Sequence, residues 1–251
     1  MNILITNDDG IHARGLNVLY KKVKPMAERT VIMVPDRERS AASQSITLHS
    51  PIRMKKIKKD IFTIDGTPAD CVYLTALKAI DFQPDIVISG INRGPNMGED
   101  IVYSGTVAAA IEATFAGFVS FAISIDAIKG KIYFESAARI AQILVSKMEH
   151  APLPKGIVLN VNVPNLPQDK IKQIKITSLG SRKYLDKLIK RKDPKGNPYF
   201  WFSGNEVKWE EKSETDFYEV KKGNISITPL HLDLTAYDVI KKLKKWRLHY
   251  G

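Results

Sequence analysis

The sequence predicts an α/β fold in which a mostly parallel sheet is covered by helices on both faces. Short, almost continuously apolar runs alternate with helix-like stretches through the first two thirds of the 251 residues. Runs of this kind are typical of parallel strands that are buried on both sides. Polar clusters follow several of the runs, which suits such a sheet because its ligands bind beyond the carboxyl ends of the strands.

Strands and helices are expected to alternate from the first residues to about residue 165. Leu16, Leu19 and Val23 recur at the spacing of one helix face. Thr67 and Pro68 suit the first turn of a helix. The expected strands are 2–6, 30–35, 62–65, 85–90, 120–125 and 157–164, and the expected helices are 14–24, one that begins at 67, 104–117 and 131–149.

Beyond residue 165 the pattern changes to turn signals, aromatic residues and short strand-like runs. Residues 166–229 are expected to form β-hairpins or an extended arm with a turn near 194–198, and a helix is expected over 236–247. An arm rich in Tyr, Phe and Trp buries its apolar side poorly on its own. We therefore predict a core over 1–165 and, over 166–251 of the same domain, elements that mediate a homo-oligomer by exchange between copies.

Composition and charge narrow the class of protein. A hydrophobic fraction of 44% is ordinary for a globular domain, and no apolar run approaches the length that spans a bilayer. The first residues lack a signal-peptide pattern and the single cysteine, Cys71, cannot form an internal disulfide, so we expect a cytoplasmic protein without a membrane partner. The net charge of +11 is compatible with an anionic partner. Nucleic acid is not expected, because the basic segments 170–195 and 241–247 lack interleaved stacking aromatic residues in a recognised module.

Two adjacent acidic residues, Asp8 and Asp9, follow the first strand, and Gly10 then permits a sharp turn. Helix capping is one explanation, because aspartate is favoured at a helix N-terminus, but capping needs only one aspartate. Two carboxylates repel each other by about 4 kcal/mol at roughly 4 Å and an effective dielectric constant of about 20. A divalent cation removes that repulsion, so the pair favours a site for Mg²⁺ or Mn²⁺, which prefer six oxygen ligands.

Neutral oxygens from other loops are needed to complete such a shell. Ser40 and Asn92 each follow a buried strand and offer an oxygen without adding charge, although both residue types also form local hydrogen bonds in turns. The segment YSGTV, which contains Ser104, Gly105 and Thr106, opens a helix and is either a plain capping turn or a phosphate site built from free amides. A metal beside a phosphate site suggests metal-assisted hydrolysis of a phosphate ester.

Other phosphate-binding and hydrolytic motifs are absent from the sequence. It contains neither the GxxxxGK[ST] pattern of a P-loop nor the GxSxG pattern of a serine nucleophile. The five histidines show no metal-ligand spacing. The functional prediction therefore depends on the acid pair and the loop segments.

Five segments occur in order along the chain: NILITNDDGI, VPDRERSAASQSIT, GTPADCV, DIVISGINRGPNMGEDIVYSGTVAAAIEA and ITPLHLDLT. In this order they resemble the motifs of the SurE (survival protein E) family of nucleotidases, most densely over residues 2–116. The resemblance implies a Rossmann-like core and a phosphatase that uses a divalent metal to hydrolyse nucleoside 5'-monophosphates. It also implies C-terminal elements that form homo-dimers or homo-tetramers.

The same resemblance implies roles for particular residues. As metal ligands it implies Asp8, Asp9, Ser40 and Asn92, and as phosphate-binding residues Ser104, Gly105 and Thr106 and, more weakly, Ser43 and Asn96. Ala41 stands where the family often has glycine, a small change that leaves the ligand assignments intact. Water activated by the metal is the expected nucleophile, while a direct role of Asp8 or Asp9 as nucleophile or base stays open.

Two hypotheses about function follow. The first is a 5'-nucleotidase, to which the family analogy adds activity on 3'-nucleotides or polyphosphate. The second is a binding protein that senses metal and nucleotide, or that binds RNA through its basic arm, with incidental turnover. Rapid release of phosphate from nucleotides favours the first hypothesis, and tight, salt-sensitive RNA binding with negligible turnover favours the second.

Overall fold

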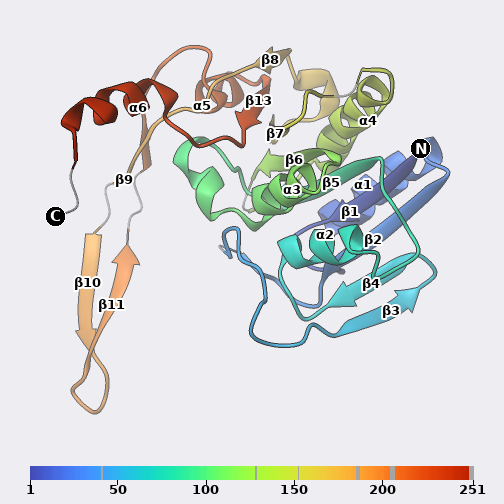
Figure 1. Cartoon of the computed structure of the whole chain (residues 1–251), viewed down its shortest axis with the longest axis horizontal. Coiled ribbons are helices and arrows are strands. Elements are labelled where there is room, and N and C mark those ends of the chain that lie inside the picture. Colours follow the sequence, from blue (N-terminus) through green and yellow to red (C-terminus); the bar gives the residue numbers. More distant parts are fainter. Residues whose placement is uncertain (41, 128, 152, 185–186, 204–206, 249–251) are drawn as a thin grey trace.

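A nine-stranded sheet forms the centre of the computed structural model (Figure 1). The structure describes every residue except 41, 128, 152, 185–186, 204–206 and 249–251, so Ala41 lies outside the described residues. In sheet order, the strands are β3 (Met54–Lys58), β4 (Ile61–Ile64), β2 (Arg29–Pro35), β1 (Asn2–Thr6), β5 (Ile86–Arg93), β6 (Val119–Asp126), β7 (Ile157–Pro164), β13 (Ile225–His231) and β8 (Ile174–Ile176). The expected α/β fold is confirmed.

The direction of the strands identifies where a ligand is expected to bind. The strands from β4 to β7 run parallel. At one edge β3 is antiparallel to β4, and beyond β7 the strand β13 is antiparallel to β7 and parallel to β8. The chain builds the sheet outward from β1 through β2 to β4, and then in the other direction from β5 through β6 to β7. The boundary between β1 and β5 is therefore the topological switch point, where open sheets of this kind bind ligands.

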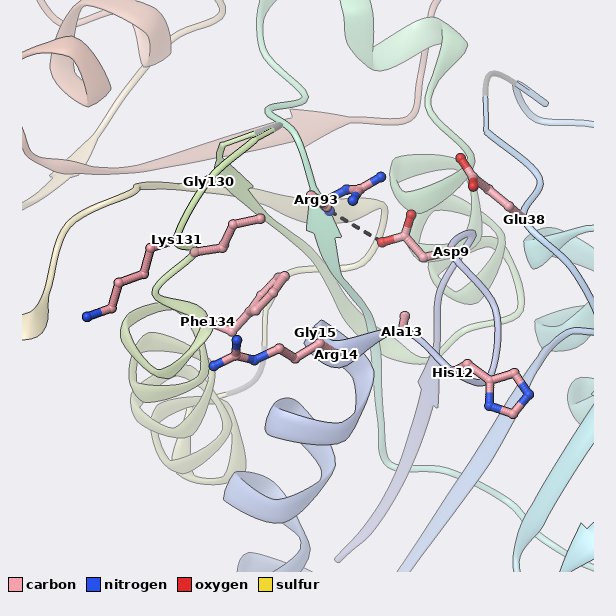
Figure 2. A pocket seen from close by; sticks show the side chains of 11 residues that line it. Asp9, His12, Ala13, Arg14, Gly15, Glu38, Arg93, Gly130, Lys131 and Phe134 are labelled. Atoms are coloured by element: carbon pink, nitrogen blue, oxygen red, sulfur yellow. Dashed lines mark hydrogen bonds between the residues drawn. The ribbon is translucent and has the colours of Figure 1, made fainter.

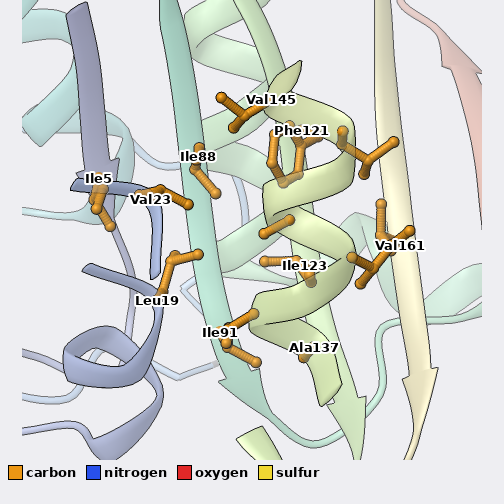
Figure 3. Close-up of a cluster of buried hydrophobic side chains, with 14 of the residues drawn as sticks. Ile5, Leu19, Val23, Ile88, Ile91, Phe121, Ile123, Ala137, Val145 and Val161 are labelled. Carbon is orange, nitrogen blue, oxygen red and sulfur yellow. The ribbon is translucent and has the colours of Figure 1, made fainter. Parts of the chain in front are cut away.

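Helices cover both faces of the sheet. On one face lie α1 (Arg14–Val23) and α4 (Phe134–His150), and on the other lie α2 (Pro68–Ala76) and α3 (Gly105–Phe115). Figure 3 shows Leu19 and Val23 of α1 and Ala137 of α4 packed over strand residues such as Ile88 and Phe121. The predicted start of α2 is confirmed, because the Thr67 side chain accepts a hydrogen bond from the backbone N–H of Asp70 in a capping box.

The chain after residue 165 forms an arm only in part. β8 and β13 extend the main sheet, and the short helix α5 (Asp216–Lys221) packs against β13. The expectation of hairpins or an extended arm over the whole of 166–229 is therefore wrong for the parts that form β8, α5 and β13. The reason is that β7 leaves an open edge, along which β13 pairs while burying Ile225 and Ile227 in the main core.

The arm itself consists of two small antiparallel sheets. Its base pairs β9 (Arg182–Tyr184) with β12 (Val207–Trp209), and its tip is the hairpin of β10 (Lys187–Lys192) and β11 (Pro198–Ser203). Asp193 closes the predicted turn by accepting hydrogen bonds from the backbone N–H groups of Lys195 and Asn197. Figure 1 shows the hairpin projecting away from the sheet.

The remaining elements are short. The predicted C-terminal helix is present as α6 (Tyr237–Leu243), followed by the 3₁₀ helix η4 (Lys244–Trp246). Three further 3₁₀ helices are η1 (Lys24–Met26), η2 (Gly98–Tyr103) and η3 (Gln168–Lys170). Within the part of the chain that the structure describes, no helix combines the length and the apolar character needed to cross a bilayer.

Candidate active site

The acid pair lies at the carboxyl end of β1, at the switch point of the sheet. Asn7 shapes the turn: its Nδ2 donates to the carbonyl of Gly10 at 3.0 Å, and its Oδ1 accepts from the N–H of Gly10 at 3.1 Å. Gly10 has a φ of +85°, a conformation that favours glycine. Asp8 is only 5% exposed, whereas Asp9 is half-buried. The turn thus presents one carboxylate inside the protein and one at its edge.

The N-terminus of α3 lies directly against Asp8. Thr106 Oγ1 donates a hydrogen bond to Asp8 Oδ1 at 2.6 Å. A Cβ atom placed on Gly105 would lie 3.1 Å from Asp8 Cβ and 3.2 Å from Asp8 Oδ2. Ser104 caps the helix, because its Oγ accepts the N–H of Val107 at 3.1 Å. The segments NDDG and YSGT therefore meet at one point, and glycine at position 105 keeps that point open.

The electrostatics of the pair favour a bound cation. Burial raises the pKa of Asp8 to about 6. The hydrogen bond from Thr106 lowers this pKa, and the negative charge of Asp9 raises it further. Burial also raises the pKa of Asp9. Asp9 accepts a hydrogen bond from the backbone N–H of Arg93 at 3.4 Å, which lowers this pKa, and the charge of Glu38 raises it. Both carboxylates are thus costly to ionise by themselves, and a divalent cation lowers that cost.

Asn92 lies near the carboxyl end of β5, next to the acid pair. The neighbouring residue Arg93 is the one whose N–H reaches Asp9, so the two strand ends are in contact. Asn92 Nδ2 donates to the carbonyl of Gly94 at 2.9 Å. That hydrogen bond leaves the amide oxygen of Asn92 as the atom that can ligate a cation.

Ser40 lies on the loop after β2, which also touches the acid pair. The N–H of Arg39 donates to the carbonyl oxygen of Asp8 at 2.8 Å, so the loop passes beside the turn. The hydroxyl of Ser40 itself donates to Glu38 Oε1 at 2.7 Å and is exposed. The fold therefore brings the segment with Ser40 to the site, while its hydroxyl contacts a third carboxylate.

Ser43, one of the two weaker candidates for phosphate binding, joins the same loop to η2. Its N–H donates to the carbonyl of Tyr103 at 3.1 Å, and its Oγ donates to the carbonyl of Val102 at 2.7 Å. Both acceptors immediately precede Ser104. In this structure Ser43 thus holds the chain just before Ser104 from the side of the loop.

Asn96, the other weaker candidate, is buried among polar groups of β6 and β7. Its Nδ2 donates to Ser124 Oγ at 2.8 Å, and its N–H donates to Asn162 Oδ1 at 2.9 Å. Its carbonyl oxygen accepts the Nδ2 groups of both Asn160 and Asn162, each at 2.8 Å. These contacts hold the GPNMG loop against the sheet.

A cavity of about 460 Å³ opens beside Asp9 (Figure 2). Its charged and polar lining includes Asp9, Glu38, His12, Arg14, Arg93 and Lys131. Figure 2 shows Asp9 and Arg93 facing each other, with their hydrogen bond dashed. Three cationic side chains at this cavity suit a negatively charged or strongly polar ligand.

The residues around the acid pair limit how a metal can be held. Among the residues that the structure describes, no group of three or more His, Cys, Asp and Glu side chains could bind a metal ion. A shell at the acid pair therefore needs neutral oxygens as well. The hydroxyl and amide oxygens on the two adjoining loops are hard donors of the type that Mg²⁺ and Mn²⁺ accept.

Comparison with known proteins decides the family. Residues 3–186 match the family described as Survival protein SurE. This chain belongs to the SurE family. A protein named 5'-nucleotidase SurE from a Geobacter species is 44% identical over 99% of this chain and 100% of its own length. The protein of the same name from Vibrio parahaemolyticus is 43% identical over 98% of this chain and 94% of its own.

A solved structure of the family shares the whole fold. The crystal structure of the SurE protein from Aquifex aeolicus matches with a TM-score of 0.89 and 42% identity, and the match covers 99% of this chain and 100% of that one. The match at full length includes the C-terminal arm region. The resemblance of the five sequence motifs to the SurE family is confirmed.

Two charged residues at the site of this SurE chain were not expected from the sequence. Glu38 accepts the hydroxyl of Ser40 and lines the cavity, and Arg93 bonds to Asp9 through its backbone. Both belong to the loop segments DRERS and GINRG that the sequence singled out. The only sequence signal for these two residues was that they are charged residues within those loops.

Proposed function

We propose that this chain is a divalent-cation-dependent 5'-nucleotidase that hydrolyses nucleoside 5'-monophosphates to nucleoside and phosphate. The observation that carries the proposal is the contact between Gly105 and the carboxylate of Asp8, because it joins a helix N-terminus to an acid pair. The name of the curated relatives, 5'-nucleotidase SurE, supports the same activity. Activity on 3'-nucleotides and on polyphosphate is an extension that the same assay tests.

The proposed cation is Mg²⁺ or Mn²⁺, held by the carboxylates of Asp8 and Asp9, the hydroxyl of Ser40 and the amide oxygen of Asn92. When bound, the cation polarises the phosphoryl group and lowers the pKa of water. The residues fit the cation chemically, because all four offer oxygen and the two acids have a raised pKa without it.

The chain's own groups then bind and orient the phosphate. The N-terminus of α3 at Gly105, with the positive end of the helix dipole, attracts the phosphate oxygens. Thr106 fixes the orientation of Asp8 through its 2.6 Å hydrogen bond, and Ser104 fixes the first turn of the helix. The cavity beside Asp9 offers the nucleoside a place on the far side of the acid pair.

A carboxylate that accepts a hydrogen bond and ligates a cation is a weak nucleophile. Asp8 accepts one from Thr106, and Asp9 accepts one from the N–H of Arg93. The proposal therefore assigns the attack on phosphorus to water and gives the two aspartates a ligand role.

The test is phosphate release from AMP and GMP with Mn²⁺ or Mg²⁺, repeated with 3'-nucleotides, polyphosphate and an excess of EDTA. Turnover that requires the metal and is lost in Asp9→Asn, with an unchanged circular dichroism spectrum, is expected. The exposed carboxylate of Asp169 supplies the matched control Asp169→Asn, which should leave the rate unchanged. Full turnover in Asp9→Asn overturns the metal assignment, and negligible turnover in the unmodified chain overturns the activity.

We further propose that the arm joins two or four copies of the chain by exchange. The support is the exposed apolar surface of the hairpin, where Trp201 is 62% and Phe202 is 87% exposed. Light scattering at micromolar concentration should give the mass of a dimer or tetramer. A monomeric mass would contradict this proposal without affecting the proposed chemistry.

A further inference from the structure

The base of the arm is bonded to η2, the segment that leads into the phosphate-binding turn. The backbone N–H of Arg182 donates to Glu99 Oε2 at 2.7 Å, and Ser181 Oγ donates to Glu99 Oε1 at 3.0 Å. The guanidinium of Arg182 forms an ion pair with Asp100. Both acids lie in the first turn of η2, which ends one residue before Ser104. The arm base and the proposed phosphate site are thus connected through η2.

Asp216 is the buried residue at the centre of this connection. It is 0% exposed, and its two carboxylate oxygens bind different segments. Oδ2 accepts the N–H of Gly98 at 2.8 Å, at the start of η2. Oδ1 accepts the N–H groups of Gly180 at 2.8 Å and Phe217 at 2.7 Å. One carboxylate therefore holds together η2, the segment that leads into β9 and the start of α5.

The backbone around Gly98 leaves little freedom for η2 to move relative to the arm base. Gly98 has a φ of +53°, and a Cβ atom placed on it would lie 2.7 Å from the carbonyl oxygen of Gly180. The two backbones approach each other at the point where Asp216 bonds to both N–H groups. A displacement of either segment therefore changes the hydrogen bonds of Asp216.

The other end of η2 is fixed at the site itself. Ser43 bonds to the carbonyls of Val102 and Tyr103, and the N–H of Ser104 bonds to the carbonyl of Ile101 at 3.3 Å. On the side of Asp216, Phe217 stacks on Trp209 of the arm base with ring centroids 3.8 Å apart. A continuous set of contacts therefore runs from the arm base through Asp216 and η2 to Ser104.

We propose that Asp216 is a positioning residue, which sets the phosphate-binding turn by holding the start of η2 against the arm base. The proposal rests on the proposed function for the meaning of that turn. It requires a carboxylate, because the three neighbouring groups are all N–H donors and only a carboxylate offers two acceptor oxygens. An amide at the same position leaves at least one buried N–H without a partner.

Asp216→Asn tests the proposal, with Glu219→Gln as the matched control. Glu219 lies on the same short helix, is also buried, and accepts Asn224 Nδ2 at 2.7 Å, but its hydrogen bond stays within α5 and the next turn. Both variants exchange one carboxylate for an amide of nearly the same shape. A general loss of stability in α5 would affect both.

Two kinds of measurement separate positioning from a merely structural role. In Asp216→Asn, the KM for AMP and the inhibition constant of inorganic phosphate should rise by about tenfold, while the activation constant for Mn²⁺ stays within about twofold. Hydrogen–deuterium exchange of the peptide over residues 97–104 should become faster. Glu219→Gln should change none of these quantities.

Failure of the proposal for Asp216 can be told apart from failure of the proposed nucleotidase function. An unmodified chain without nucleotide turnover contradicts the proposed function, while the exchange rate over 97–104 still decides the role of Asp216. An unchanged phosphate constant and an unchanged exchange rate in Asp216→Asn overturn the present proposal, as does an equal change in both variants. If Asp216→Asn does not fold, Gly98→Ala tests the same contact from η2. A normal phosphate constant in Gly98→Ala would then overturn the proposal.

Discussion

At the rim around β1 and β5, the polar side chains bond to one another and to nearby backbone, whereas on the β10–β11 hairpin large apolar side chains face solvent. Asp8 is buried, and its carboxylate is held by Thr106 from a helix that begins far along the chain. Phe202, in contrast, is 87% exposed. One copy of the chain can therefore assemble the proposed site, while the arm is suited to contact another molecule.

The two regions are nevertheless joined by α5 and η2. The carboxylate of Asp216 bonds to both sides, and Arg182 at the arm base pairs with Asp100 of η2. Changes at the rim should therefore alter activity, and changes at the arm tip should alter the oligomeric mass. Changes at the junction, where Asp216 joins η2 to the arm base, should alter phosphate binding. The largest of these effects is expected at the rim and the smallest at the arm tip.

Asp8→Asn should lower kcat by more than about 100-fold. Asp8 is a proposed metal ligand, and loss of a ligand matters more than loss of the surrounding residues, which costs about 10- to 100-fold. The Asn side chain can still accept the hydrogen bond of Thr106, so the fold should be kept. Phosphate release from AMP and light scattering measure the two effects. The contrast between the regions fails if this variant loses its oligomeric mass but keeps its turnover.

Gly105→Ala should lower kcat/KM for AMP by about 10- to 100-fold, because the added methyl group enters the space beside Asp8. Gly117→Ala, just beyond the other end of α3, is the control. Nothing lies within 4 Å of a Cβ atom at Gly117, although its φ of +88° is strained for alanine. The control should cost about 1 kcal/mol of stability and no activity. Equal losses of activity in both variants would mean that the effect is destabilisation.

The metal-free protein should lose stability as the pH rises from about 4 to about 6. The pKa of Asp8 is raised to about 6 in the folded chain, from a model-compound value of 3.8, so the folded state binds more protons than the unfolded state in this interval. The free energy of unfolding should therefore fall by an amount on the order of 2 kcal/mol and then level off.

Urea unfolding in EDTA across this pH range measures the effect. Asp8→Asn should show a smaller decline, because only Asp9 of the pair then keeps a raised pKa. Saturating Mn²⁺ should also reduce the decline in the unmodified chain at neutral pH, because the cation binds the ionised carboxylates. A decline of the same size in Asp8→Asn would show that other groups cause it. The raised pKa of Asp8 would then be irrelevant to the stability of the rim.

Phe202→Glu should reduce the oligomeric mass while changing kcat per chain by less than about threefold, because the arm tip lies outside the rim. The control is Lys195→Ala, in the exposed turn of the same hairpin, which should leave the mass unchanged. A large loss of kcat in Phe202→Glu would contradict the separation of the arm tip from the site. It would mean that the junction at Asp216 transmits the state of the arm to the site.

Much of the architecture could be predicted from apolar runs, because a parallel strand buried on both faces is apolar along its length. This holds for β1, β2 and β5, whose interior residues are almost all buried. It does not hold for β3, whose sequence MKKIK is exposed throughout and pairs only at the edge of the sheet. The helix α5 was missed because six residues carry too little periodicity to indicate a helix.

The meeting of NDDG with YSGT could also be expected, because both lie where the carboxyl ends of parallel strands gather. The hydrogen-bond partners of individual side chains could not be expected from the sequence. Asn96 directs its amide to Ser124 and its backbone to Asn160 and Asn162, which lie on strands that only the folded sheet brings near. Its predicted role in phosphate binding stays a prediction.

The fold class, the SurE resemblance and the position of the acid pair could be read from the sequence, because they follow from hydrophobic periodicity and from short motifs that are local in the chain. Three features become visible only in the folded chain: β13 extends the sheet, Gly105 lies against Asp8, and Asp216 bonds to η2. These contacts join residues far apart in sequence. Their geometry depends on close packing of the whole molecule, which no local pattern encodes.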